Sequence, residues 1–269
     1  MGWENRRVIE ESMIRALHVQ AMQTRDLHAG HQSRTLFQAS TVSALLDGSY
    51  EGDLSFAELA GHGDTGLGTL NGLDGEMIAI DGGFLRADAH GNINEIDPGA
   101  LTPFAVVSWF EPDLEFRVAS VSGFDELVRQ MEAVIPSDAP AEAIRIDGVF
   151  GGGTARSVPR QEPPYRPLAE VVAEQNVFEI PAGPGTVVGF RFPDYSEGIE
   201  IAGYHLHFVD KARRMGGHVL DLSLEEATVR VETSSDLHIE LPPGMDLGSP
   251  DLASDTHAAI ERAERLQSE

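Results

Sequence analysis

The spacing of apolar residues at the start of the chain predicts a helix. Apolar residues recur there every four positions with charged residues between them: Ile9, Met13, Leu17 and Ala21. This spacing is typical of one face of an amphipathic helix. We therefore predict a helix over residues 4 to 27, followed by a polar segment after Gly30. Residues 1–30 are expected to form a helical extension of the body.

From residue 31 to about 165, short β-prone runs alternate with brief helical ones. Strands are predicted at residues 77–80, 104–110 and 143–150, a strand followed by a helix at 35–46, and helices at 55–60 and 124–133. A proline-rich connector at residues 159–167 ends this region. We expect residues 31–165 to form an N-terminal α/β domain.

Beyond the connector the pattern becomes a succession of alternating runs joined by short turns. The predicted strands are residues 186–192, 200–209, 218–223, 226–233 and 236–241. This succession is typical of an antiparallel meander, and a helix at residues 255–267 is predicted to close the chain. The expected fold class is α/β (α+β), with two domains built on mixed or antiparallel β-sheets and flanking helices. Residues 166–269 are expected to form the second, β-rich domain.

Composition narrows the range of functions. The net charge is −25, from 44 acidic and 19 basic residues, and such a surface repels the phosphates of nucleic acids. The chain contains no cysteine, so a metal ion would need His, Asp or Glu ligands. No apolar run is long enough to span a membrane, and no secretory signal is evident. We expect a cytoplasmic protein that binds neither nucleic acid nor membrane.

His205 and His207 carry the sharpest chemical signal. Residues two apart on a strand project from the same face, so the two imidazoles are expected to point together. His218 follows beyond a turn that contains Gly216 and Gly217. If this turn is a hairpin, the three histidines converge from paired strands into an open tetrahedral zinc site on the C-terminal domain. Surface or core histidines without a metal are the alternative interpretation.

Other known motifs fit less well. A cupin-type oxygenase would place a glutamate soon after the second histidine, but residues 211–213 are Lys, Ala and Arg. No His-Glu-x-x-His sequence indicates a zincin protease, and Gly66-Leu67-Gly68 lacks the remaining residues of a nucleotide-binding loop.

Three longer segments resemble the signature of α-acetolactate decarboxylases. They are His62 to Glu76 (His-Gly-Asp-Thr-Gly-Leu-Gly-Thr-Leu-Asn-Gly-Leu-Asp-Gly-Glu), Leu46 to Asp53 (Leu-Asp-Gly-Ser-Tyr-Glu-Gly-Asp) and Thr102 to Ala105 (Thr-Pro-Phe-Ala). The segment Gly203 to Phe208 also resembles the zinc-binding strand of this family, with His218 as third ligand. The chain departs from the family pattern at Thr65 and Leu70, where aromatic residues are expected.

The resemblance implies one zinc ion per chain, two α/β domains and a homodimer. It also implies that Glu76 and Glu264 are active-site carboxylates, that Arg156 lies beside the substrate and that Thr69 lies close to the same pocket. The spacing of apolar residues in the C-terminal segment places Glu264 at the shoulder of the apolar helix face.

The implied reaction is decarboxylation of 2-acetolactate (2-hydroxy-2-methyl-3-oxobutanoate) to acetoin and CO2. Loss of CO2 from a β-keto acid requires an electron sink at the ketone. A lysine imine is disfavoured because Lys211, the only lysine, lies in a polar turn, so a zinc ion that stabilises the enediolate is expected. Two alternatives stay open: a metal-dependent lyase for another 2-hydroxy-3-keto acid, and a non-catalytic metal-binding module of the same fold.

Overall fold

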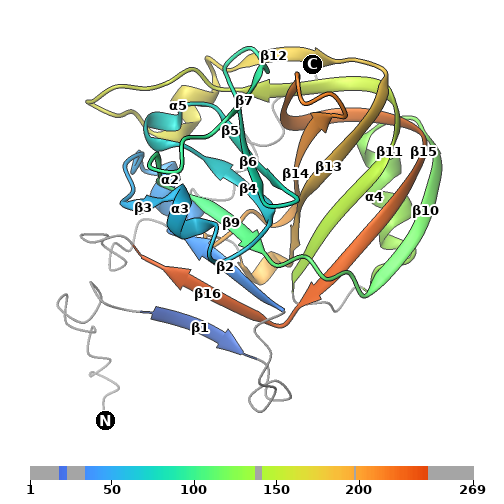
Figure 1. The fold of residues 1–269 in the computed structure, drawn as a ribbon, viewed down its shortest axis with the longest axis horizontal. Coiled ribbons are helices and arrows are strands. Elements are labelled where there is room, and N and C mark those ends of the chain that lie inside the picture. The colour runs from blue at the N-terminus through green and yellow to red at the C-terminus, as the bar shows by residue number, and fades with distance from the viewer. Residues whose placement is uncertain (1–17, 23–33, 137–140, 197, 242–269) are drawn as a thin grey trace, which may run out of the picture.

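The computed structural model describes residues 18–22, 34–136, 141–196 and 198–241. They form two large β-sheets with short helices around them (Figure 1). Within these ranges, no helix combines the length and the apolar character that crossing a membrane would require.

The first sheet has eight strands. In spatial order they are β1 (His18–Met22), β16 (Asp236–Glu240), β2 (Thr35–Ala39), β9 (Ala105–Ser108), β4 (Thr65–Thr69), β5 (Glu76–Ile80), β6 (Gly83–Ala87) and β7 (Ile93–Glu95). All neighbours are antiparallel except β16 and β2, which are parallel. This mixed sheet therefore joins strands from both ends of the described chain.

The second sheet has six antiparallel strands. Their order is β10 (Leu114–Val121), β15 (Gly216–Ser234), β14 (Gly203–Asp210), β13 (Gly183–Phe192), β11 (Ala141–Ser157) and β12 (Asn176–Ile180). Because β11 also pairs with β15 over most of its length, the sheet closes on itself like a small barrel.

Short elements complete the fold. They are the helices α2 (Val42–Leu46), α3 (Phe56–Leu59), α4 (Phe124–Glu132) and α5 (Leu168–Val172), the 3-10 turns at Asn71–Leu73 and Asp194–Ser196, and a two-strand ladder of β3 (Leu54–Ser55) and β8 (Leu101–Thr102). The helix α4 buries Leu127 and Met131, four residues apart on one helix face, and contacts β10 and β15.

The two sheets pack against each other through β4 and β5, which contact β13, β14 and β15. All five residues of β5 are buried, as expected for a strand covered on both faces. Ile78 and Ile80 belong to one buried cluster with Val188 of β13 and Val209 of β14. This contact fixes β5 against the strand that carries His205 and His207.

The predicted mixed α/β class is confirmed, but the N-terminal helix is wrong over residues 18–22. These residues form β1, which pairs antiparallel with β16. Backbone pairing with a neighbouring strand overrides the local apolar spacing there, because spacing and propensity are weak determinants beside tertiary contacts. The remainder of the predicted helix and the closing helix at 255–267 lie outside the described residues.

The predicted meander holds for β13, β14 and β15, but then changes. The two strands expected at 218–223 and 226–233 form one strand, β15. The last expected strand, β16, belongs to the first sheet instead of continuing the meander. Conversely, β10 and β11 precede residue 165 and pair with strands that follow it. The sheets thus draw strands from both sides of the predicted domain boundary.

Candidate active site

Three buried histidines lie together where β14 and β15 pair. His207 is directly opposite His218 in the antiparallel register, and His205 lies two residues before His207 on β14. One ring nitrogen of each histidine lies within 4.8 Å of those of the other two. The hairpin therefore brings the three side chains together as the sequence predicted.

The main chain of β5 fixes the orientation of His207. Its Nδ1 lies 2.8 Å from the carbonyl oxygen of Met77. A carbonyl oxygen only accepts hydrogen bonds, so Nδ1 carries the proton and donates it. The Nε2 atom is then the nitrogen left with a lone pair for a metal ion. Such a hydrogen bond from the other ring nitrogen is the usual partner of a metal-bound histidine.

His218 is held in its neutral form. Burial in the protein and the nearby Arg156 guanidinium keep the pKa of its imidazole well below its ordinary value, because both disfavour a positive charge on the ring. A neutral imidazole is the form that binds a metal ion.

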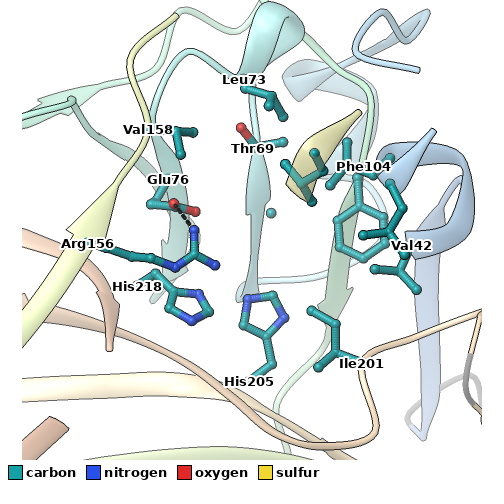
Figure 2. Close-up of a pocket in the computed structure, with 14 residues that line it drawn as sticks. Val42, Thr69, Leu73, Glu76, Phe104, Arg156, Val158, Ile201, His205 and His218 are labelled. Atoms are coloured by element: carbon teal, nitrogen blue, oxygen red, sulfur yellow. Dashed lines mark ion pairs between the residues drawn. The ribbon is translucent and has the colours of Figure 1, made fainter. Parts of the chain in front are cut away.

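Glu76 and Arg156 extend the site beyond the histidines. Arg156 on β11 is directly opposite His218 on β15, and its Nη1 lies 3.7 Å from Oε1 of Glu76 (Figure 2). The other carboxylate oxygen of Glu76 lies 3.6 Å from Nε2 of His207. Glu76 is 8% exposed and Arg156 is 6% exposed, so both charges act in a poorly solvated environment.

Thr69 ends β4 and is opposite Glu76, the first residue of β5. Its hydroxyl donates a 2.7 Å hydrogen bond to the Gly75 carbonyl, and its carbonyl accepts a 2.7 Å hydrogen bond from the Thr102 hydroxyl. These bonds fix the turn that delivers Glu76 to the site. Thr69 also lines the cavity, which agrees with the predicted place beside the pocket.

A cavity that opens to solvent lies beside His205 and His218. Its polar side is formed by these histidines with Glu76, Arg156 and Thr69. The remaining walls are mostly apolar and come from side chains with no distinctive sequence signal: Val42, Leu45, Leu46, Leu73, Phe104, Val158, Leu168 and Ile201. Figure 2 shows Val42, Phe104 and Ile201 across the cavity from Glu76 and Arg156. Sequence reasoning missed this apolar side.

The remaining predicted positions have different outcomes. Glu264 lies outside the described residues. Thr65 and Leu70, the departures from the family pattern, are buried, but neither lines this cavity. Leu70 instead packs with Phe37, Phe56 and Met77.

The residues present fit a zinc ion. Three buried imidazoles with a carboxylate close by, in a chain without cysteine, form a ligand set of the kind used in catalytic zinc sites. Three protein ligands leave coordination positions open, and a small molecule bound in the adjoining cavity can occupy them.

Comparison with known proteins decides the family. The sequence model of the family described as alpha-acetolactate decarboxylase matches residues 36–254. The chain belongs to the α-acetolactate decarboxylase family. The predicted resemblance and the assignment to the carboxy-lyases are thereby confirmed.

Individual relatives of the family cover most of the chain. An α-acetolactate decarboxylase of Methylococcus capsulatus is 43% identical over 235 residues, which cover 87% of this chain and 90% of the relative. One from Bacillus subtilis is 39% identical, with 82% and 88% covered. The crystal structure of α-acetolactate decarboxylase from Bacillus subtilis strain 168 superposes with a TM-score of 0.81 at 38% identity, covering 86% of this chain and 99% of that one.

Proposed function

We propose that this chain decarboxylates 2-acetolactate to acetoin and CO2, with one zinc ion bound by His205, His207 and His218. The observation that carries the proposal is the buried cluster of three imidazoles beside the Arg156–Glu76 pair at the wall of one cavity. Family membership supports the same reaction.

The reaction needs an electron sink and one proton. The bond between C1 and C2 breaks, CO2 leaves, and the electron pair passes from C2 toward the ketone oxygen at C3 to give an enediolate. A proton added at C2 then gives acetoin. A bound zinc ion would supply Lewis acidity that stabilises the enediolate.

Arg156 orients the substrate carboxylate in this proposal. Its guanidinium presents planar N–H donors that match a carboxylate, and its burial strengthens the attraction. The opposed positions of Arg156 and His218 place the guanidinium beside the histidine cluster. Arg156 would therefore hold the carboxylate that leaves as CO2, while C2 and C3, which keep the electron pair, would lie beside the histidine cluster.

Glu76 handles protons in the proposed mechanism. Its two oxygens face Arg156 and His207, so it adjoins both the carboxylate end of the substrate and the metal ligands. Glu264 is the second proton-handling group on the strength of the family resemblance. One of these two carboxyl groups helps to deliver the proton to C2.

The test is zinc content and acetoin release on purified wild type, His207→Ala and His90→Ala. His90 is exposed and serves as the matched histidine control. We expect one zinc ion per chain and acetoin formation for wild type and His90→Ala, and loss of both for His207→Ala. Bound zinc without acetoin would contradict 2-acetolactate as substrate and favour another 2-hydroxy-3-keto acid or a non-catalytic module. Absence of zinc from the wild type would contradict the metal site.

We also propose, on the basis of the family resemblance, that the protein is a cytoplasmic homodimer. Light scattering after size-exclusion chromatography tests the dimer against the 29.1 kDa chain mass. Fractionation of cells that express the protein tests the location.

A further inference from the structure

We propose that Val42, Phe104 and Ile201 form an alkyl subsite that limits the size of the substrate's hydrocarbon groups. This inference rests on the proposed function, because it concerns the groups that the polar residues do not bind. The three residues are called the apolar wall below. They face Glu76 and Arg156 across the cavity (Figure 2).

The chemistry of the substrate divides in the same way as the cavity. A 2-hydroxy-3-oxo acid carries its carboxylate, hydroxyl and ketone oxygens on adjacent carbons, so all three can address the polar side together. Its remaining substituents are the alkyl group on C2 and the alkyl group of the acyl end. These alkyl groups face the apolar wall. Burying their methyl or methylene groups against it removes them from water and favours binding.

The apolar wall is fixed rather than adaptable. Val42 begins α2, and its N–H donates a 3.0 Å hydrogen bond to the Ile199 carbonyl. The next residue, Ser43, donates a 3.1 Å bond to the Gly198 carbonyl. These bonds tie the start of α2 to the segment that carries Ile201. Val42 and Ile201 are 2% and 6% exposed, so neighbouring residues pack around both side chains.

Phe104 is tied directly to the polar side of the site. Its carbonyl accepts a 3.0 Å hydrogen bond from the N–H of Thr69, and its N–H donates a 3.2 Å bond to the Thr102 hydroxyl. A Cβ atom on Gly68 would lie 2.4 Å from the Phe104 carbonyl oxygen, so glycine is required for this approach. The distance between the apolar wall and the polar residues is therefore set by main-chain hydrogen bonds, which makes the cavity width a constraint on substrate size.

More apolar side chains adjoin the wall and line the same cavity. Val42, Phe104 and Ile201 pack in one buried cluster with Leu45, Leu46 and Leu168. Shortening a wall residue would therefore open space toward other hydrocarbon groups, with no polar atom of these side chains to desolvate. This is the environment in which a longer alkyl group gains binding energy, at about tenfold or more per methylene.

The experiment measures kcat/KM for two series of 2-hydroxy-3-oxo acids. One series lengthens the C2 substituent from methyl to ethyl and propyl, and the other lengthens the acyl end from acetyl to propionyl. The wild type is compared with Ile201→Ala and Phe104→Leu. The control is Ile135→Ala, which truncates an isoleucine of similar burial (5% exposed) that does not line the cavity.

We expect Ile201→Ala or Phe104→Leu to raise the ratio of kcat/KM for a longer substrate to that for 2-acetolactate by about tenfold. The control should leave this ratio unchanged. A filling variant, Val42→Ile, should lower the ratio for the ethyl substrate. Because a ratio is measured, a partial loss of folded protein cancels.

The outcomes separate the two proposals. Wild-type turnover of 2-acetolactate with unchanged ratios in all three wall variants, in both series, would overturn the alkyl subsite alone. Absence of 2-acetolactate turnover in the wild type would overturn the proposed function and the subsite with it.

Discussion

Arg156 and His218 lie directly opposite each other on β11 and β15. Directly opposed residues of an antiparallel pair project from the same face of the sheet. The register of these two strands therefore sets a guanidinium beside an imidazole of the proposed metal site, and it does so without any loop. A slip of one residue would move one of the two side chains to the other face.

Replacing Arg156 should separate turnover from metal binding. Arg156→Gln is expected to lower kcat/KM for 2-acetolactate by roughly 100-fold or more, because a buried charge-assisted contact to the carboxylate is lost. Zinc should stay near one per chain, since Arg156 is not a ligand. Steady-state kinetics with metal analysis checks this, and Arg160→Gln, at a largely exposed arginine, is the control. Unchanged kcat/KM in Arg156→Gln would exclude the proposed role.

Glu264→Gln tests the residue that only the family resemblance assigns. We expect turnover to fall by roughly 100-fold, in line with loss of a general acid or base, while zinc remains bound. Glu261→Gln, one helical turn away in the predicted helix, is the control and should retain activity. Wild-type turnover by Glu264→Gln would remove this residue from the mechanism.

Removal of zinc should lower thermal stability as well as activity. A ligand that binds only the folded state stabilises it by about 2.7 kcal/mol at a free concentration one hundred times Kd. We therefore expect a chelator to lower Tm by roughly 5–10 °C for a chain of this size, and added zinc to restore it. In His207→Ala the chelator should have no effect on Tm. An equal shift in the variant would mean that the stabilising metal binds elsewhere.

Gly189 permits the close approach of β13 to β14, the strand that carries His205 and His207. A Cβ atom at this position would lie 2.0 Å from the His205 carbonyl oxygen. Gly189→Ala should therefore force β13 and β14 apart, cost about 1–3 kcal/mol of folding free energy and weaken zinc binding. Calorimetry and zinc titration measure both effects. Gly99→Ala, whose Cβ would meet only the Asp97 side chain, should leave both unchanged.

Glu232 should make stability depend on pH. Burial raises the pKa of its carboxyl group to about 7, although the Glu111 N–H and the Ser108 hydroxyl donate to it. Between pH 4.5 and 7 the unfolded chain releases this proton and the folded protein keeps it, so stability falls as pH rises. This loss of folding free energy is absent below pH 4.5 and reaches its full value of roughly 3 kcal/mol above pH 7.

Glu232→Gln removes this titration. The variant should be as stable as the wild type near pH 4.5 and more stable above pH 7, as measured by urea unfolding at each pH. A constant difference across this range would show that the carboxyl group of Glu232 does not keep its proton in the folded protein.

The histidine site could be predicted from the sequence because it depends on local geometry. Alternation on one strand and a glycine-containing hairpin were sufficient to bring His205, His207 and His218 together. Each of these features lies within a few residues of the side chain that it positions. Glu76, by contrast, was implied only by the resemblance of the glycine-rich segment to the family.

The apolar wall and β1 could not be predicted for the opposite reason. Val42, Phe104 and Ile201 share no periodicity, because each comes from a different segment and they meet only in the folded chain. Residues 18–22 form a strand through pairing with residues 236–240. Local apolar spacing contains no information about a partner so distant in sequence.

The parallel pairing of β16 with β2 also determines the order in which the protein can assemble. The residue Thr35 is paired with Asp236, so the strand next to β2 is among the last described parts of the chain to be synthesised. At 5 to 20 residues per second, β2 waits about 10 to 40 s for this neighbour to leave the ribosome. During that interval one edge of β2 is open to other chains. Until β16 has been synthesised, nascent chains thus keep this edge of β2 open to association with other chains.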